Sequence, residues 1–214
     1  MDIKTQRENW IDVAKCIAMI LIILGHVSSE LQGWWHFRWV YGVHVLMFFL
    51  LSGYTLKINN LTKEYINKKF SRLMVPYFVT CFFVIVMDIV NCRIIQNDFS
   101  IAHVTQVISG DLIRSFFSSG SLEYFGTIVI GSRIGAIWFL PAMFFAMIFV
   151  QYVLNRVKNA KEQGIILALL AMTAYITKDF FWLPFSLQSA MMGSFFLWIG
   201  FMVKNLKILE KMKW

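Results

Sequence analysis

Long apolar runs, each close to the length of a membrane-spanning helix, dominate this sequence of 214 residues. Hydrophobic residues make up 58% of the chain and charged residues only 15%, whereas a soluble domain is typically about half apolar and a quarter charged. A helical span requires about 20 apolar residues. We therefore predict an all-α, polytopic membrane helix bundle with about six spans. These are residues 10–28, 38–56, 73–91, 134–154, 164–181 and 184–203.

The formal net charge of +8 follows membrane topology and does not indicate a nucleic-acid partner. If the N-terminus is cytoplasmic, fourteen Lys and Arg residues fall in the inner segments and five in the outer segments. This asymmetry is the positive-inside bias. It predicts a multi-pass protein of the plasma membrane with both termini in the cytoplasm and with membrane lipid as its surroundings.

The first apolar run carries three ionisable residues, Asp12, Lys15 and His26. Such residues are rare inside a membrane and usually serve an ion, a substrate or one another. Lys15 and His26 are eleven residues apart, which places them on one face of a helix and about 16 Å apart along its axis. Asp12 and Lys15 could neutralise each other as an i, i+3 pair, but that pairing would leave His26 unexplained unless it is a structural histidine.

The second run contains His44, Phe48 and Ser52 at i, i+4 and i+8, so these residues share a broad face. Ser52 is followed by Gly53, and two interpretations of this pair are open. Small residues allow close packing between membrane helices. The same small residues would also leave room for an extended ligand.

Basic residues gather just before the third run, at Lys68, Lys69 and Arg72. One interpretation is ordinary topology with contact to lipid headgroups. The other is a phosphate site, because an arginine fork and lysine charges at the start of a helix, with its free N–H groups, favour an anion.

The outer stretch after the third run is too long for a simple connector. Apolar residues recur in it at helical spacing from Ile101 to Phe116, which predicts a surface-lying or re-entrant helix. Asp88, near the outer end of the third run, is interpreted as a helix-packing or interface group. The four histidines do not form a compact ligand set, so no metal site is expected. A non-enzymatic transporter or proton path through the ionisable residues is an open alternative.

Several short motifs together resemble the acyltransferase-three family of integral-membrane acyltransferases, and most closely its fucose-O-acetylase-like branch. The motifs are Arg7-x-x-x-x-Asp12-x-x-Lys15, Gly25-His26, His44 with Phe48-Phe49-Leu50-Leu51-Ser52-Gly53-Tyr54, Lys68-Lys69-x-x-Arg72-x-x-x-Pro76-Tyr77, Trp138-Phe139-Leu140, and Leu183 to Gly200. The resemblance extends in order over nearly the whole chain.

The resemblance implies transfer of an acyl group, usually acetyl, from cytoplasmic acetyl-CoA to a hydroxyl of an extracytoplasmic or lipid-linked carbohydrate. His26 is the implied catalytic group, with His44, Lys15 and Asp12 beside it. The implied donor side comprises Ser52 and Gly53 together with Lys68, Lys69 and Arg72. An imidazole that titrates near neutral pH suits the role of general base.

Two features depart from the family pattern. Family members generally have about ten spans, whereas about six are predicted here, and Gln188 stands where this branch is expected to have an acidic residue. We therefore expect residues 1–214 to form one acyltransferase-like membrane domain that is incomplete at its C-terminal end and that partner helices would complete. A truncated or inactive family member is the alternative.

Overall fold

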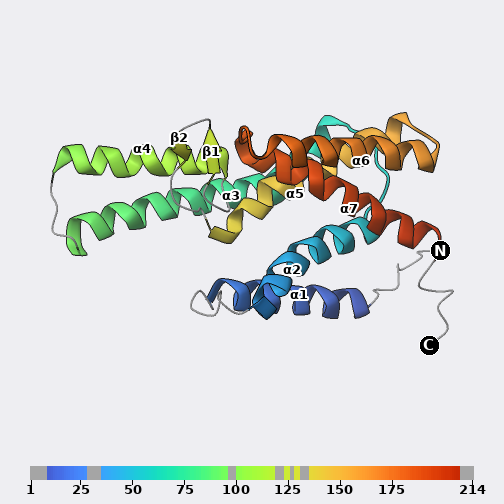
Figure 1. Ribbon diagram of the computed structural model, residues 1–214, viewed down its shortest axis with the longest axis horizontal. Helices are drawn as coiled ribbons and strands as arrows, with labels where there is room; N and C mark the ends of the chain where they lie inside the picture. Colours follow the sequence, from blue (N-terminus) through green and yellow to red (C-terminus); the bar gives the residue numbers. More distant parts are fainter. Residues whose placement is uncertain are drawn as a thin grey trace. The chain divides into compact units, whose positions relative to one another are not determined.

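The computed structural model describes residues 9–27, 35–95, 100–118, 123–125, 128–130 and 135–207, and these are almost entirely helical. The all-α prediction is confirmed, and Figure 1 shows how the helices are connected. The helices of the described residues are α1 (Asn9–Val27), α2 (Trp35–Tyr54), α3 (Lys63–Val90), α4 (Ile101–Phe117), α5 (Phe139–Arg156), α6 (Ala160–Thr177) and α7 (Leu187–Asn205). A small antiparallel hairpin, β1 (Glu123–Phe125) with β2 (Ile128–Ile130), was not predicted.

Three helical segments within the described residues are long and apolar enough to cross a membrane. They are Lys63–Ile94, Gly135–Arg156 and Pro184–Asn205, and they correspond to the third, fourth and sixth predicted spans. The other predicted spans coincide with α1, α2 and α6. The count of six spans and the orientation of the termini stay predictions.

The third helix begins at Lys63, about three turns before the start predicted at residue 73. Thr62 caps this helix, because its hydroxyl oxygen accepts a hydrogen bond from the Tyr65 backbone N–H at 3.2 Å. Glu64 adds a negative charge in the first turn, where the helix dipole favours it. The segment resembled a loop because it is polar, but its lysines and glutamate are good helix formers.

The chain divides into two compact units, residues 1–57 with 196–214 and residues 58–195. In the first unit α1 packs against α2. Trp10 and Tyr54 meet edge to face with ring centroids 5.0 Å apart. Ile11 and Ala18, two turns apart on α1, are buried. The face of α1 that carries these two residues is therefore its packed face.

In the same unit α2 and the second half of α7 cross at two glycines. A Cβ atom added to Gly53 would lie 1.8 Å from the carbonyl oxygen of Leu197, and one added to Gly200 would lie 2.0 Å from that of Leu50. Each helix thus places a glycine against the backbone of the other. Only residues without a Cβ allow membrane helices to approach this closely.

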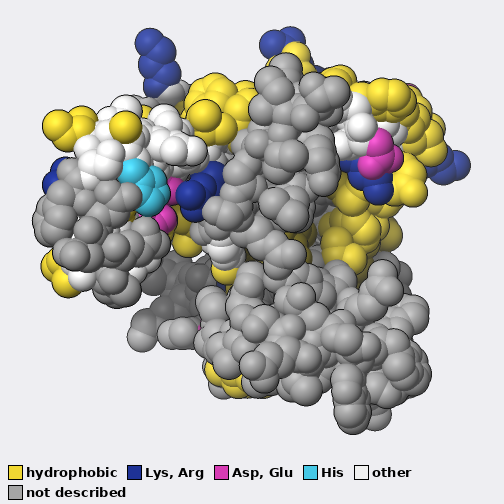
Figure 2. All heavy atoms as spheres, turned by 60° about the vertical axis from the view of Figure 1, so that its left-hand side comes forward, with side chains coloured by type: hydrophobic (Ala, Val, Ile, Leu, Met, Phe, Trp, Pro, Cys, Tyr) yellow, Lys and Arg dark blue, Asp and Glu magenta, His cyan; other side chains and the backbone are white. Residues whose placement is uncertain are grey.

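The second unit packs α5 and α4 against α3. Its core contains Met74, Tyr77 and Cys81 of α3 and Phe144 of α5. Phe185, in the 3₁₀ turn before α7, extends this core. Large apolar side chains are exposed on α3, α4 and α6, and Figure 2 shows hydrophobic side chains at the surface of the described residues.

Ser118, just after the last turn of α4, is buried, and two hydroxyl groups donate to carbonyl oxygens at this end of the helix. The Tyr77 hydroxyl donates to the carbonyl oxygen of Ser115, and the Ser186 hydroxyl donates to that of Ser118. Ser118, Phe185 and Ser186 all have positive φ angles, of 53°, 55° and 50°. A helix end without water needs such partners for its last carbonyls.

A charged cluster joins α4 to the second half of α3. Arg114 Nη2 lies 2.9 Å from Asp111 Oδ1, and Arg114 Nη1 lies 4.0 Å from Asp88 Oδ2. Only 2% of the Asp111 side chain is exposed. Burial raises the pKa of the Asp111 carboxyl, the Arg114 guanidinium opposes that shift, and the Asp88 carboxyl adds to it. The interpretation of Asp88 as a packing group is consistent with this contact.

We predict that Gly53→Ala and Gly200→Ala each lower the free energy of unfolding by about 1–3 kcal/mol, because the new methyl group would overlap a backbone carbonyl. Gly110→Ala is the matched control. Its nearest neighbour would be Arg114 Nη2 at 3.9 Å, so helix propensity should make it neutral or stabilising by up to about 1 kcal/mol. Thermal unfolding in detergent measures all three. Equal Tm values for the three variants would contradict the close crossing.

We predict that Asp111→Asn gains stability relative to the wild type as the pH rises above about 4, the ordinary pKa of aspartate. The folded protein holds the Asp111 proton more tightly than the unfolded chain does. The wild type therefore loses stability as the pH rises toward the folded-state pKa, and the asparagine variant has no such loss at this position. The difference in Tm between the two proteins, followed with pH, measures this effect. The exposed Asp179, changed to asparagine, is the control, and a Tm difference for Asp111→Asn that does not change with pH would contradict the prediction.

Candidate functional site

The first helix carries Asp12, Lys15 and His26 within one unbroken segment, Asn9–Val27. The eleven-residue spacing between Lys15 and His26 therefore holds on a continuous helix, and their backbone positions share a face. Lys15 is half-buried and follows the same stripe as the buried Ile11 and Ala18. Asp12 is exposed. The side chain of His26 lies outside the described residues, so the direction of its imidazole stays a prediction.

The second helix carries His44, Ser52 and Gly53. The side chain of His44 also lies outside the described residues. Ser52 is half-buried, and its carbonyl oxygen accepts a hydrogen bond of 3.2 Å from the Thr55 hydroxyl. Gly53 is buried against the Leu197 backbone. The position of Gly53 therefore agrees with the first interpretation of this pair, close packing between helices.

The residues Lys68, Lys69 and Arg72, here called the basic cluster, lie inside α3 and not at its beginning. The prediction that they sit beside the free N–H groups of a helix start is wrong, because the first turn of α3 is formed by Lys63 to Ile66. Lys68 and Arg72 are exposed and Lys69 is half-buried. The Lys69 ammonium lies 5.6 Å from the centre of the Tyr65 ring.

No ion pair to the basic cluster is found within the part of the chain that the structure describes, although Glu64 stands one helical turn before Lys68. Arg114, by contrast, lies beside both Asp88 and Asp111. Lys68 and Arg72 instead lie close enough to Lys69 for mutual repulsion. Three cations gathered on one stretch of a helix repel one another and favour negative charge nearby.

The predicted site residues fall into two groups by compact unit. Those on α1 and α2 belong to the first unit, and the basic cluster belongs to the second. Within the first unit, the packing of α1 against α2 brings the helices of Lys15 and Ser52 together.

Sequence reasoning noted Gln188 only as a departure from the branch pattern, and the structure gives it a definite role. Its side-chain amide donates hydrogen bonds to the Phe181 carbonyl oxygen at 2.6 Å and to the Thr177 hydroxyl at 3.4 Å. Its carbonyl oxygen accepts from the Leu183 N–H at 2.7 Å. An ionised carboxylate could accept from Leu183 but could not donate to Phe181. Gln188 therefore ties the end of α6, the following loop and the start of α7 together.

Sequence reasoning also missed the pairing of Asp111 with Arg114. Their i, i+3 spacing was the available signal. His103, on the same helix, has its Nδ1 atom 3.7 Å from Cys92 Sγ. No group of three potential metal ligands occurs among the described residues.

A family model described as an acyltransferase domain matches residues 8–214. None of the curated proteins and none of the solved structures matches the chain. The family match runs from the residue before α1 to the last residue and so includes every helix described above. With its long apolar helices and this match, the chain belongs to the acyltransferase-three family of membrane acyltransferases.

Proposed function

We propose that this protein is a multi-pass O-acyltransferase of the plasma membrane, of the fucose-O-acetylase-like branch. It moves an acetyl group from cytoplasmic acetyl-CoA to a hydroxyl of an extracytoplasmic or lipid-linked carbohydrate. The observation that carries this proposal is the continuous helix α1, which bears Lys15 and His26 on one face in a chain of the acyltransferase family. Ionisable residues inside such a helix mark a functional path.

His26 acts as the general base on the acceptor. Its imidazole takes the proton of the acceptor hydroxyl while the hydroxyl oxygen bonds to the thioester carbonyl carbon. The carbon–sulfur bond then breaks, and the CoA thiolate leaves and takes up that proton. His44 assists by orienting the acceptor or by polarising the thioester carbonyl. Lys15 and Asp12 provide charge on the same helix, about 16 Å or more from His26 along its axis, and so act at the other end of the path and not on the imidazole directly.

The basic cluster binds the phosphates of the donor. Arg72 offers a bidentate fork, and Lys68 and Lys69 supply point charges. Lys68 and Arg72 are exposed and no ion pair among the described residues holds them, so their side chains are accessible to a phosphate. On α2, Gly53 serves the contact with α7, and we assign the half-buried Ser52 to the donor side.

His26→Ala is predicted to reduce acetyl transfer by about 10²–10⁴-fold, the usual loss when a general base is removed. Membranes with and without the protein are incubated with labelled acetyl-CoA, and mass spectrometry of the glycans reports the product. His103→Ala is the matched control, because this histidine contacts Cys92 on the neighbouring helix segment and should leave transfer unchanged. Undiminished product from His26→Ala, with normal amounts of protein in the membrane, would refute the catalytic assignment.

Replacing all three residues of the basic cluster by glutamine is predicted to raise the KM for acetyl-CoA at least about tenfold, equivalent to about 1.4 kcal/mol. The KM for acetyl-pantetheine, a donor without the nucleotide and its phosphates, should not change. Steady-state transfer with the two donors measures both values. Lys161→Gln, at an exposed position near the start of α6, is the control. Equal effects on the two donors would count against phosphate binding.

A further inference from the structure

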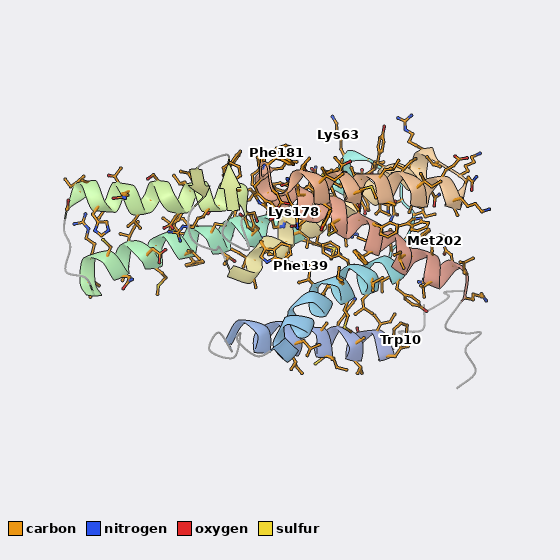
Figure 3. All side chains as sticks on the ribbon, in the orientation of Figure 1. Trp10, Lys63, Phe139, Lys178, Phe181 and Met202 are labelled. Atoms are coloured by element: carbon orange, nitrogen blue, oxygen red, sulfur yellow. The ribbon has the colours of Figure 1, made fainter. Side chains whose placement is uncertain are left out.

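The seam between α3 and α4 contains charged and polar groups, although many large apolar side chains are exposed on both helices. Asp88 of α3 lies opposite Arg114 of α4, and Asp111 precedes Arg114 by one helical turn. One turn further along the chain from Asp88, Cys92 Sγ lies 3.7 Å from His103 Nδ1. Figure 3 shows side chains with nitrogen and oxygen atoms between the ribbons of α3 and α4. Such groups in an apolar hairpin serve either a structural contact or a ligand.

The three charged side chains of this seam differ in their access to the surface. The Asp111 side chain is 2% exposed, whereas those of Arg114 and Asp88 are 22% and 40% exposed. Arg114 Nη2 lies 2.9 Å from Asp111 Oδ1. The buried carboxyl group of Asp111 therefore holds the guanidinium from inside, and Asp88 and Arg114 are the members that a ligand can reach.

The gap between Asp88 and Arg114 is wider than a hydrogen bond. Arg114 Nη1 lies 4.0 Å from Asp88 Oδ2, whereas a direct N–H···O bond spans about 2.7–3.2 Å. A hydroxyl oxygen at about 2.8 Å from both atoms would bridge this gap, because it can accept from the guanidinium and donate to the carboxylate. The pair is thus spaced for one bridging hydroxyl group.

The cluster also has more hydrogen-bonding capacity than the contact between the two helices uses. Asp111 Oδ2 and Arg114 Nε are buried and have no hydrogen-bond partner in the described part of the chain. The same holds for the hydroxyl of the buried Ser118, one helical turn after Arg114. Buried polar atoms of a purely structural contact are normally satisfied by the protein or by water. These atoms indicate that the seam accommodates a further polar group.

The charges of the cluster restrict what this group can be. A phosphate or a carboxylate would lie beside two carboxyl groups, which disfavour another negative charge. A metal ion would lie beside the guanidinium, and no group of three potential metal ligands occurs among the described residues. An uncharged hydroxyl meets neither obstacle, and it matches one donor and one acceptor at the same time. A neutral sugar carries several such hydroxyls.

We infer that Asp88 and Arg114 hold a neutral sugar of the acceptor by one of its hydroxyl groups, with Asp111 as a positioning residue behind the guanidinium. The inference rests on the function proposed above, because that function supplies a carbohydrate acceptor. The topology predicted from the sequence places Asp88 near the outer end of the third span, on the side where an extracytoplasmic acceptor arrives. Sugars that carry a carboxylate or a phosphate do not fit this site.

Two variants test the site by acetyl transfer to membrane glycans over a range of acetyl-CoA concentrations. Asp88→Ala should cost little stability, because Asp88 is partly exposed and lies 4.0 Å from Arg114. Arg114→Gln is combined with Asp111→Asn, so that no buried carboxylate loses its guanidinium. In both variants we expect the maximal transfer rate to fall at least about tenfold, the usual effect of losing a hydrogen bond to a charged group. The KM for acetyl-CoA should not change.

His103→Ala is the matched control, because it alters the same seam but leaves the gap between Asp88 and Arg114 intact. It should keep the wild-type transfer rate. A wild-type rate in either site variant would overturn the inference, since water alone would then fill the gap. An equal loss in His103→Ala, or a loss that follows the amount of folded protein, would overturn it as well, because the stability of the hairpin would explain the result.

The wild-type protein gives a second readout that does not depend on how the variants fold. Mass spectrometry of the glycan product shows which sugar carries the acetyl group, and we expect a sugar without carboxylate or phosphate. Acetyl groups on acidic sugars would overturn the inference. If the wild type acetylates no glycan, the proposed function fails and the acceptor site fails with it. Product from the wild type together with unaffected site variants refutes the acceptor site alone.

Discussion

The structure depends on one constraint: a polar group inside an apolar bundle must find its partner within the protein. In the second unit the buried polar side chains point inward, and large apolar side chains cover α3, α4 and α6 outside. Asp111 meets Arg114, Gln151 accepts from the Asn59 backbone, and Gln188 bonds to the loop after α6. Without water, each missing partner would be expensive. These polar contacts therefore determine which helices can lie side by side.

Apolar length and composition predicted where the helices lie, but not where each begins. The start of α3 was misplaced because residues 63–72 are polar, and a hydropathy pattern cannot distinguish a polar loop from a polar helical end. The helix begins at Lys63 because Thr62 caps it, and this cap depends on one hydrogen bond from the Tyr65 backbone N–H. Gly53 shows a similar limit. Its small size was evident in the sequence, but its use depends on Leu197, more than a hundred residues away.

The candidate site was predictable to the extent that it follows helical spacing. A continuous α1 preserves the relation between Lys15 and His26 that their spacing indicated. Apart from the Asp111–Arg114 pair, whose i, i+3 spacing is visible in the sequence, the missed contacts join separate elements. Asp88 joins Arg114 in this way, and that contact depends on the register of the α3–α4 hairpin. The spacing of residues within one helix cannot predict that register. The amide network of Gln188 was missed for the same reason, since its partners come from the end of α6 and from the loop.

The cations of this fold differ in the groups that lie beside them. Arg114 pairs with carboxylates, and near helix ends Arg156 and Lys178 lie over the rings of Tyr152 and Tyr175. These contacts hold the three cations against the protein. In the basic cluster the Tyr65 ring lies beneath Lys69 in the same way, and Glu64 stands one helical turn before Lys68, but no ion pair to the cluster is found among the described residues. Lys68 and Arg72 repel Lys69, because these like charges lie within about one helical turn of it. Negative charge close to these three residues would relieve that repulsion, as the carboxylates of Asp88 and Asp111 do for Arg114.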